Sequence, residues 1–313
     1  MKKVLAINSG SSSFKYKLFS FPSEEVIAKG GAERVGMPNS IFKIKLANGN
    51  EYIKNMSIPT QRDAVSLLID CLKKYHVVEK LSEIKGVGHR IVNGGEVFPN
   101  SVVIDNHNLH KLERIAQLAP LHNGPETEGI KAFMSILPNV PQVAVFDTAY
   151  HHTLDAVHYL YSIPYKYYKD YAVRKYGAHG TSVRYVAPRA AKMMHKNINI
   201  ARLIVCHLGS GSSITAVKNG KSYDTSMGFS PLTGVTMGTR SGDFDPSALQ
   251  YLMHKTGMDI DQAIDMLNQE SGLLGISGVS SDMRDLIESD EPRAKLARRI
   301  YINRVVRYVG AYA

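Results

Sequence analysis

The stretch Asn8-Ser9-Gly10-Ser11-Ser12-Ser13-Phe14-Lys15 is small, polar and glycine-containing, and an apolar segment flanks it on each side. Residues 4–7 (Val-Leu-Ala-Ile) precede it, and apolar residues afterwards alternate with Lys15 and Lys17. Such alternation is typical of a half-buried strand, so we predict a strand-turn-strand hairpin. Backbone N–H groups and hydroxyls in such a turn suit phosphate oxygens, and Lys15 adds a positive charge. A Ser/Gly-rich turn without a ligand explains this stretch equally well when it is taken alone.

A second copy of the pattern begins the other half of the chain. The apolar run Leu203-Ile204-Val205-Cys206-His207 leads into Leu208-Gly209-Ser210-Gly211-Ser212-Ser213, and Ile214-Thr215-Ala216-Val217 leaves it as a strand. Two copies this far apart predict two similar domains rather than a solenoid of many short repeats. Facing each other, two such hairpins would form the walls of a phosphate-binding cleft.

Strands and helices alternate along the chain, which indicates an α/β class. Thr60, with Asp63 three residues later, predicts a helix start, and Pro125 is expected at the first position of another helix that ends before Pro138. Residues 180–182 are expected to cap a further helix. We place the domain boundary near Tyr150, which gives domains 1–150 and 151–313.

Composition limits the class of protein. Of 313 residues, 44% are hydrophobic and 21% charged, which fits a folded globular chain, and no apolar run approaches a membrane span. The short apolar run after Lys3 meets Asn8 at once, so we expect no signal peptide. Cys71 and Cys206 are predicted to be buried thiols, in keeping with a reducing cytoplasm.

The formal net charge of +10 raises the possibility of a nucleic-acid partner. The densest basic cluster lies between residues 293 and 307, and aromatic residues do not interleave with it as a base-stacking surface requires. We interpret the cluster as a solvated helix face, and expect neither a nucleic-acid nor a membrane partner. The tyrosine-rich segment 159–176 is interpreted as a packed connection or a subunit interface, where tyrosine is enriched.

Six motifs in order along the chain resemble the acetate kinase family. They are the stretch 8–15, Gly88-His89-Arg90-Ile91-Val92-Asn93-Gly94-Gly95, Ala119-Pro120-Leu121-His122-Asn123, Phe146-Asp147-Thr148-Ala149, Gly177-Ala178-His179-Gly180-Thr181-Ser182 and Met237-Gly238-Thr239-Arg240-Ser241-Gly242-Asp243. The resemblance implies two ribonuclease-H-like domains of the actin-like ATPase fold around a nucleotide cleft. It also implies reversible transfer of phosphate from ATP to acetate, giving ADP and acetyl phosphate, with Mg²⁺ or Mn²⁺ in a homodimer.

By the same resemblance, Arg90, Asp147, His179 and Arg240 would be catalytic. Two arginines suit a carboxylate and a transferring phosphoryl group, and His179 can donate a hydrogen bond to that group. A carboxylic acid is already ionised at neutral pH, so acetate needs no general base. We therefore expect Asp147 to position the magnesium shell or a basic side chain, with Asn8 as the other metal-side residue.

The resemblance also assigns the binding residues. The substrate would contact Arg90, Val92, Leu121, His122, Ala178 and Pro231, and the nucleotide would contact Ser11, Ser13, Lys15, His207, Leu208, Gly209, Ser210, Gly211, Asp282, Met283 and Arg284. Two positions depart from many family members, which carry Phe in place of Ala178 and Asn in place of Ser210. The first change enlarges the pocket for the acyl chain, and the second replaces an amide by a hydroxyl.

The final helix, residues 292–313, carries an apolar stripe that stops at Ala313 without a capping glycine. The family's glycine-rich adenine segment and metal-binding glutamate have no counterpart, so we expect a C-terminally truncated second domain. Two further readings therefore stay open beside acetate kinase. One is a propionate or butyrate kinase of the same family, which Ala178 favours, and the other is a nucleotide-binding module without turnover.

Overall fold

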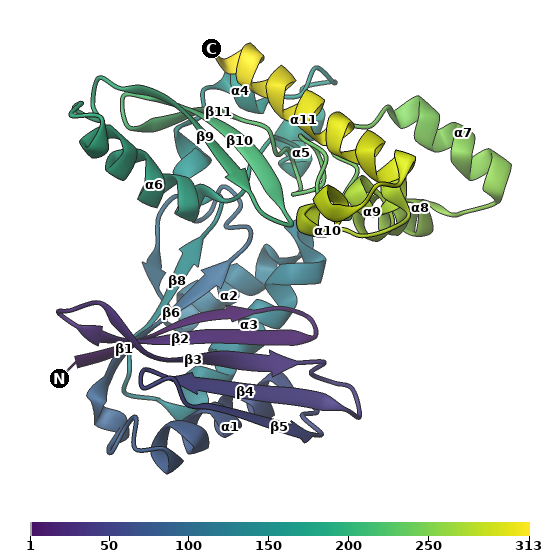
Figure 1. The fold of residues 1–313 in the computed structure, drawn as a ribbon. Helices are drawn as coiled ribbons and strands as arrows, with labels where there is room; N and C mark the ends of the chain where they lie inside the picture. Colours follow the sequence, from purple (N-terminus) through teal and green to yellow (C-terminus); the bar gives the residue numbers. More distant parts are fainter. Residues whose placement is uncertain (1) are drawn as a thin grey trace. The chain divides into compact units, whose positions relative to one another are not determined.

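The computed structural model describes residues 2–313, without the side chains of residues 120–122. The chain divides into two compact units, Met1–Ala149 and Tyr150–Ala313 (Figure 1). Among the described residues, no helix is both long and apolar enough to cross a lipid bilayer.

The first unit is built on a mixed sheet with the strand order β5-β4-β3-β2-β1-β6-β8-β7. Strands β1, β6 and β8 run parallel to one another, and the other neighbours pair antiparallel. The strands are β1 (Lys2–Ser9), β2 (Ser13–Phe21), β3 (Glu25–Glu33), β4 (Ser40–Leu46), β5 (Glu51–Met56), β6 (Ile84–Ile91), β7 (Val102–Val103) and β8 (Gln142–Phe146). The predicted first hairpin is β1 and β2, and it is confirmed with Ser9 opposite Phe14.

Helices α1 (Gln61–Lys74) and α3 (Pro120–Ile136) pack together against one face of this sheet. Leu5, Phe14, Leu68 and Phe133 share that core, because alternate strand residues and one stripe of each helix face the same layer. The remaining helical segments of the unit are η1 (Leu81–Glu83), α2 (Asn106–Arg114) and η2 (Ala116–Leu118), and η3 (Ala149–Thr153) begins at the division between the units.

The helix ends test three sequence predictions. Thr60 caps α1, where its hydroxyl accepts from the Asp63 amide and the Asp63 carboxylate accepts from the Thr60 amide, as predicted. The end of α3 before Pro138 is confirmed, with Leu137 as the C-cap. The expected start at Pro125 is wrong, because Pro120 fills the first turn equally well and Pro125 lies inside the helix.

The second unit contains a three-stranded antiparallel sheet with the order β11-β10-β9. Its strands are β9 (Arg202–Leu208), β10 (Ser212–Lys218) and β11 (Lys221–Thr225), so the second predicted hairpin, β9 and β10, is confirmed. The helices are α4 (Ala156–Tyr159), α5 (Lys166–Tyr171), α6 (Gly180–Met193), α7 (Pro246–Thr256), α8 (Ile260–Gln269), α9 (Gly272–Ser277), α10 (Met283–Glu288) and α11 (Pro292–Tyr312).

Small separate cores stabilise this unit. Helix α6 packs on the sheet through Val183 and Ala187 against Val205 and Val217, while α9, α10 and α11 share a separate core. Cys206 follows Val205 and points to the opposite face, because successive strand residues alternate. The prediction that Cys206 is buried is therefore wrong, and Cys71 in α1 is only partly buried.

Candidate active site

The first hairpin brings Asn8 and Lys15 next to each other, since they pair directly across β1 and β2. The turn between the strands is closed by a hydrogen bond of 2.7 Å from the Gly10 amide to the Ser13 carbonyl. A Cβ atom at Gly10 would lie 2.9 Å from the Ser13 hydroxyl, which would have to rotate away. Ser11 lies on this turn and is exposed.

Arg90 joins the hairpin to the end of β8. Its Nη2 and Nε atoms lie 2.7 and 3.0 Å from Asp147 Oδ2, and its Nη1 atom donates to Asn8 Oδ1 at 3.4 Å. Asp147 is buried, whereas 41% of the Arg90 side chain is exposed. A cavity of about 600 Å³ is lined by Asn8, Lys15 and Arg90 along the sheet face opposite α1 and α3. The first unit thus gathers two cations, an amide and a carboxylate at one end of its sheet.

Glu126 is a buried carboxyl group that the sequence analysis missed. Its Oε2 atom accepts from the Val92 amide at 3.0 Å, and the residue is 2% exposed. Burial raises the pKa of Glu126 to about 8, although the Val92 hydrogen bond and the nearby Arg90 oppose the shift. The sequence did contain a signal of this burial, because Glu126 precedes the apolar residues Ile130 and Phe133 by four and seven residues and so shares their helix face.

Of the remaining predicted substrate residues of the first unit, one has a described side chain and two do not. Val92 is buried beside Glu126. Leu121 and His122 lie in α3, but their side chains fall outside the described part of the structure, so those two assignments stay predictions.

In the second unit, His179 is the N-cap of α6 and has a left-handed backbone with φ of 61°. The expectation that residues 180–182 provide the cap is wrong by one residue, because the helix already begins at Gly180. His179 Nδ1 lies 2.9 Å from the Ser213 hydroxyl, and its ring stacks on His207 with centroids 4.0 Å apart. His207 Nδ1 in turn lies 3.0 Å from the Ser182 hydroxyl. These contacts hold the two imidazoles as one stacked pair.

Gly211 marks the place where His179 and Arg240 come together. A Cβ atom at Gly211 would lie 3.4 Å from both Arg240 Nη1 and His179 Nε2. Arg240 Nη1 also donates to the Pro231 carbonyl at 3.4 Å. Ala178 is buried with Met227 and Met237, which precedes Arg240 by three residues. The second unit therefore places a guanidinium and an imidazole beside a glycine turn, close to an apolar cluster.

The turn between β9 and β10 is joined to the glycine-rich loop by backbone contacts. The Gly238 amide donates to the Ser210 carbonyl at 3.0 Å. A Cβ atom at Gly238 would lie 3.3 Å from that carbonyl and 3.2 Å from the Ser281 carbonyl, so three segments meet here. Within the turn, the Gly209 amide donates to the Gly211 carbonyl, and Leu208 is exposed.

Asp282 follows Ser281 and caps α10. It accepts from the Arg284 amide at 2.9 Å and forms an ion pair of 2.6 Å with the exposed Arg284 side chain. That side-chain hydrogen bond holds the pKa of Asp282 near 2. Met283 packs beside the core of α9 to α11. The predicted nucleotide residues of the second unit therefore lie on segments that meet at Gly238.

Residues 2–313, as described, contain no group of three or more His, Cys, Asp or Glu side chains able to hold a metal ion. The oxygen donors beside Arg90 are Asn8 Oδ1 and the Asp147 carboxylate. A divalent cation that keeps several waters and takes one or two protein oxygens together with substrate phosphates fits this donor set.

The fold and these clusters define a phosphotransferase that handles small anions. The acetokinase family model matches residues 3–313, and the chain belongs to this family. The chain is 55% identical over 317 residues to an acetate kinase of Lacticaseibacillus paracasei and 50% identical over 316 residues to that of Bacillus subtilis. Each alignment covers 100% of this chain and 80% of the relative.

Solved structures agree with this assignment. The acetate kinase of Porphyromonas gingivalis superposes with a TM-score of 0.94 at 44% identity, and a propionate kinase of Francisella tularensis with 0.94 at 41%. Each comparison covers 100% of this chain and 80% of the solved chain. The expected actin-like ATPase fold and the expected kinase activity are thereby confirmed.

Proposed function

We propose that the chain transfers the γ-phosphoryl group of ATP to acetate reversibly, forming acetyl phosphate and ADP, with Mg²⁺ as the divalent cation. The observation that carries the catalytic assignment is the meeting of Arg240 Nη1 and His179 Nε2 at Gly211. Hydrogen-bond donors of this kind stabilise the charge on the equatorial oxygens of a transferring phosphoryl group.

An acetate carboxylate oxygen forms a bond to the γ-phosphorus, the bond to the β,γ-bridging oxygen breaks, and ADP leaves with that electron pair. No proton is removed from acetate, because the acid is already ionised at neutral pH. Arg90, partly exposed and charged, would bind the acetate carboxylate. Its ion pair with Asp147 supports a positioning role for that carboxylate rather than a role as a base.

The two Gly/Ser hairpins would bind phosphate oxygens. Ser11, Ser13 and Lys15 are the predicted contacts in the first unit, and His207 and residues 208–211 are those in the second, with residues 282–284 against the nucleotide. Asn8 and Asp147 would hold the cation, which neutralises phosphate charge when bound. We infer that the two units are the two ribonuclease-H-like domains of the family fold.

Ala178 and Pro231 would face the methyl group of acetate. The small Ala178 side chain and the likeness to a propionate kinase structure favour propionate as a second substrate. We also propose a homodimer in the cytoplasm. The exposed tyrosines Tyr165 and Tyr171 support a subunit interface, and the unpaired thiols of Cys71 and Cys206 suit a reducing compartment.

The test replaces Arg240 by alanine and measures acetyl phosphate trapped with hydroxylamine. We expect kcat to fall by about 10²- to 10³-fold, as it does when one donor to transition-state charge is removed. The matched control is Arg202→Ala. Arg202 is the first residue of β9, at the opposite end of the strand from the hairpin turn, and its side chain is exposed. Equal activity in both variants would refute the role of Arg240.

A further inference from the structure

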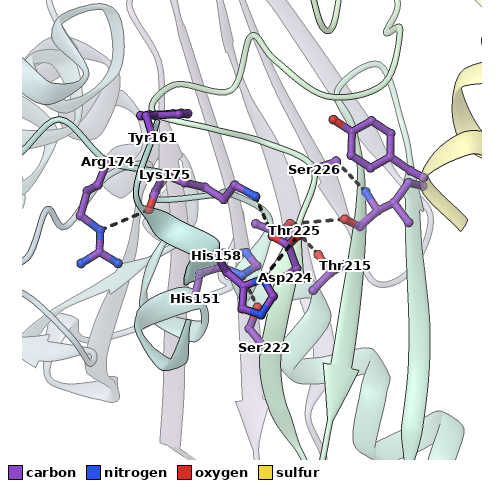
Figure 2. Close-up of polar contacts among 12 residues, drawn as sticks. His151, His158, Tyr161, Arg174, Lys175, Thr215, Ser222, Asp224, Thr225 and Ser226 are labelled. Atoms are coloured by element: carbon purple, nitrogen blue, oxygen red, sulfur yellow. Dashed lines mark hydrogen bonds and ion pairs between the residues drawn. The ribbon is translucent and has the colours of Figure 1, made fainter. Parts of the chain in front are cut away.

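His151 is a buried histidine in η3 that the proposed reaction does not use. It is 1% exposed, and each ring nitrogen has a polar neighbour. The Nε2 atom lies 2.9 Å from the Ala178 carbonyl oxygen, and the Nδ1 atom lies 2.8 Å from the Ser222 hydroxyl. Figure 2 shows the His151 ring beside Ser222 on β11.

The proton arrangement follows from the partners. A carbonyl oxygen can only accept, so Nε2 carries a proton and donates to Ala178. In the neutral ring Nδ1 is then an acceptor, and the Ser222 hydroxyl donates to it. Ser222 is buried and its carbonyl accepts from the Thr153 hydroxyl at 2.8 Å, so η3 is attached to β11 at two points.

The Ala178 carbonyl belongs to the peptide group that directly precedes His179. The carbonyl and the His179 amide lie in one planar peptide group. A hydrogen bond to the carbonyl oxygen therefore holds the orientation of that plane, and with it the backbone angle φ of His179. The φ values of Gly177 and His179 are 75° and 61°, a region that is uncommon for residues other than glycine. A Cβ atom at Gly177 would lie 2.8 Å from His151 Cδ2, so the His151 ring also packs against this turn.

We propose that His151 is a positioning residue: its Nε2–H group holds the Ala178–His179 peptide so that His179 keeps its left-handed backbone and points Nε2 at the Gly211 turn. This inference rests on the proposed function in one respect, namely that His179 contacts the transferring phosphoryl group. His151 itself touches no substrate.

Three variants separate this role from simple packing. His151→Gln places an amide N–H near the position of Nε2 and keeps the bond to Ala178. His151→Asn is too short to reach that carbonyl but can still bond to Ser222, and His151→Phe fills the volume without either bond. We expect kcat to fall about 10- to 100-fold in the Asn and Phe variants, as misplacement of a reacting group does. His151→Gln should stay within about threefold of the wild type, with KM for ATP nearly unchanged throughout.

The control is His158→Asn. His158 lies in α4, the next helix after η3, and faces Asp224, with Nδ1 3.9 Å from the carboxylate. Figure 2 shows it near Lys175, which pairs with that carboxylate. This variant should keep the wild-type kcat. Hydrogen exchange of the peptide 176–183 gives a readout apart from activity, and it should quicken in His151→Asn but not in His151→Gln. If His151→Asn fails to fold, Ser222→Ala serves instead, because it removes only the hydrogen bond to Nδ1. It should lower kcat and quicken the exchange of 176–183 in the same direction but to a smaller extent.

A double-mutant cycle with His179→Ala decides how His151 acts. If His151 works through His179, adding His151→Asn to His179→Ala should lower kcat by less than about twofold. Additive losses, or failure of His151→Gln to restore kcat, would overturn the positioning role. A wild-type kcat in His179→Ala would instead refute the proposed catalytic role of His179, provided the exchange result for His151 holds.

Discussion

Replacing Glu126 by glutamine should make the protein more stable at neutral pH, which is the opposite of the usual result for a buried residue. The pKa of this carboxyl is raised from 4.5 to about 8 because the group is buried. The native state therefore keeps a proton that the unfolded state loses. The stability that depends on this proton is fully present below about pH 4.5, and it is lost as pH rises toward about 8.

Each pH unit in that interval lowers the free energy of unfolding by about 1.4 kcal/mol. At about pH 7.5 the wild-type protein has lost about 4 kcal/mol from this group. Glutamine stays neutral and its carbonyl can still accept from the Val92 amide, so Glu126→Gln does not lose that stability. The variant should match the wild type at about pH 4.5 and exceed it by several kcal/mol at about pH 7.5.

Urea unfolding of both proteins at matched pH values measures this difference in free energy of unfolding. The contributions of ionisable groups that both proteins share cancel when the two values are subtracted. Glu128→Gln on the same helix is the control. Its side chain is 64% exposed and pairs with Lys131, so its effect should stay below about 1 kcal/mol at every pH. If Glu126→Gln destabilises the protein equally from about pH 5 to about pH 8, Glu126 is ionised in the native state and the reasoning fails.

Two further predictions concern the reaction. Asp147→Asn should lower activity in a way that shifts with magnesium concentration while the pH profile keeps its shape, and loss of one limb of that profile at unchanged magnesium dependence would establish a base instead. Ala178→Phe should lower the ratio of kcat/KM for propionate to that for acetate by about 5- to 150-fold, because one methylene in an apolar pocket is worth about 1–3 kcal/mol. An unchanged ratio would place Ala178 outside the acyl pocket.

The elements of the fold that were predictable are those with strong local patterns. The two hairpins follow from apolar alternation around small polar turns, and the start of α1 follows from the reciprocal bonds of Thr60 and Asp63. Pro125 was misplaced because proline marks a helix start only statistically, and Pro120 fits that position as well.

The geometry within each cluster was less accessible from sequence. The family resemblance implied Arg90 and Asp147, but not that the guanidinium would bond to both Asp147 and Asn8. Glu126 was overlooked although its spacing to Ile130 and Phe133 places it on their helix face. His151 was overlooked because its importance depends on a backbone partner that arrives from a distant segment. The substrate roles of the individual side chains stay predictions until the variants are measured.

The contact between the Gly238 amide and the Ser210 carbonyl has a consequence for how this protein can diversify. Because the bond joins main chain to main chain, it is indifferent to the side chain at position 210. Ser210 can therefore be exchanged for asparagine, changing the chemistry offered to a nucleotide, while the two loops stay attached. Gly238 has less latitude, since a Cβ atom there would lie 3.3 Å from the Ser210 carbonyl and 3.2 Å from the Ser281 carbonyl, and these main-chain groups would have to shift by a few tenths of an ångström. A substitution at position 210 therefore leaves this contact intact, whereas a substitution at position 238 requires the neighbouring main chain to move.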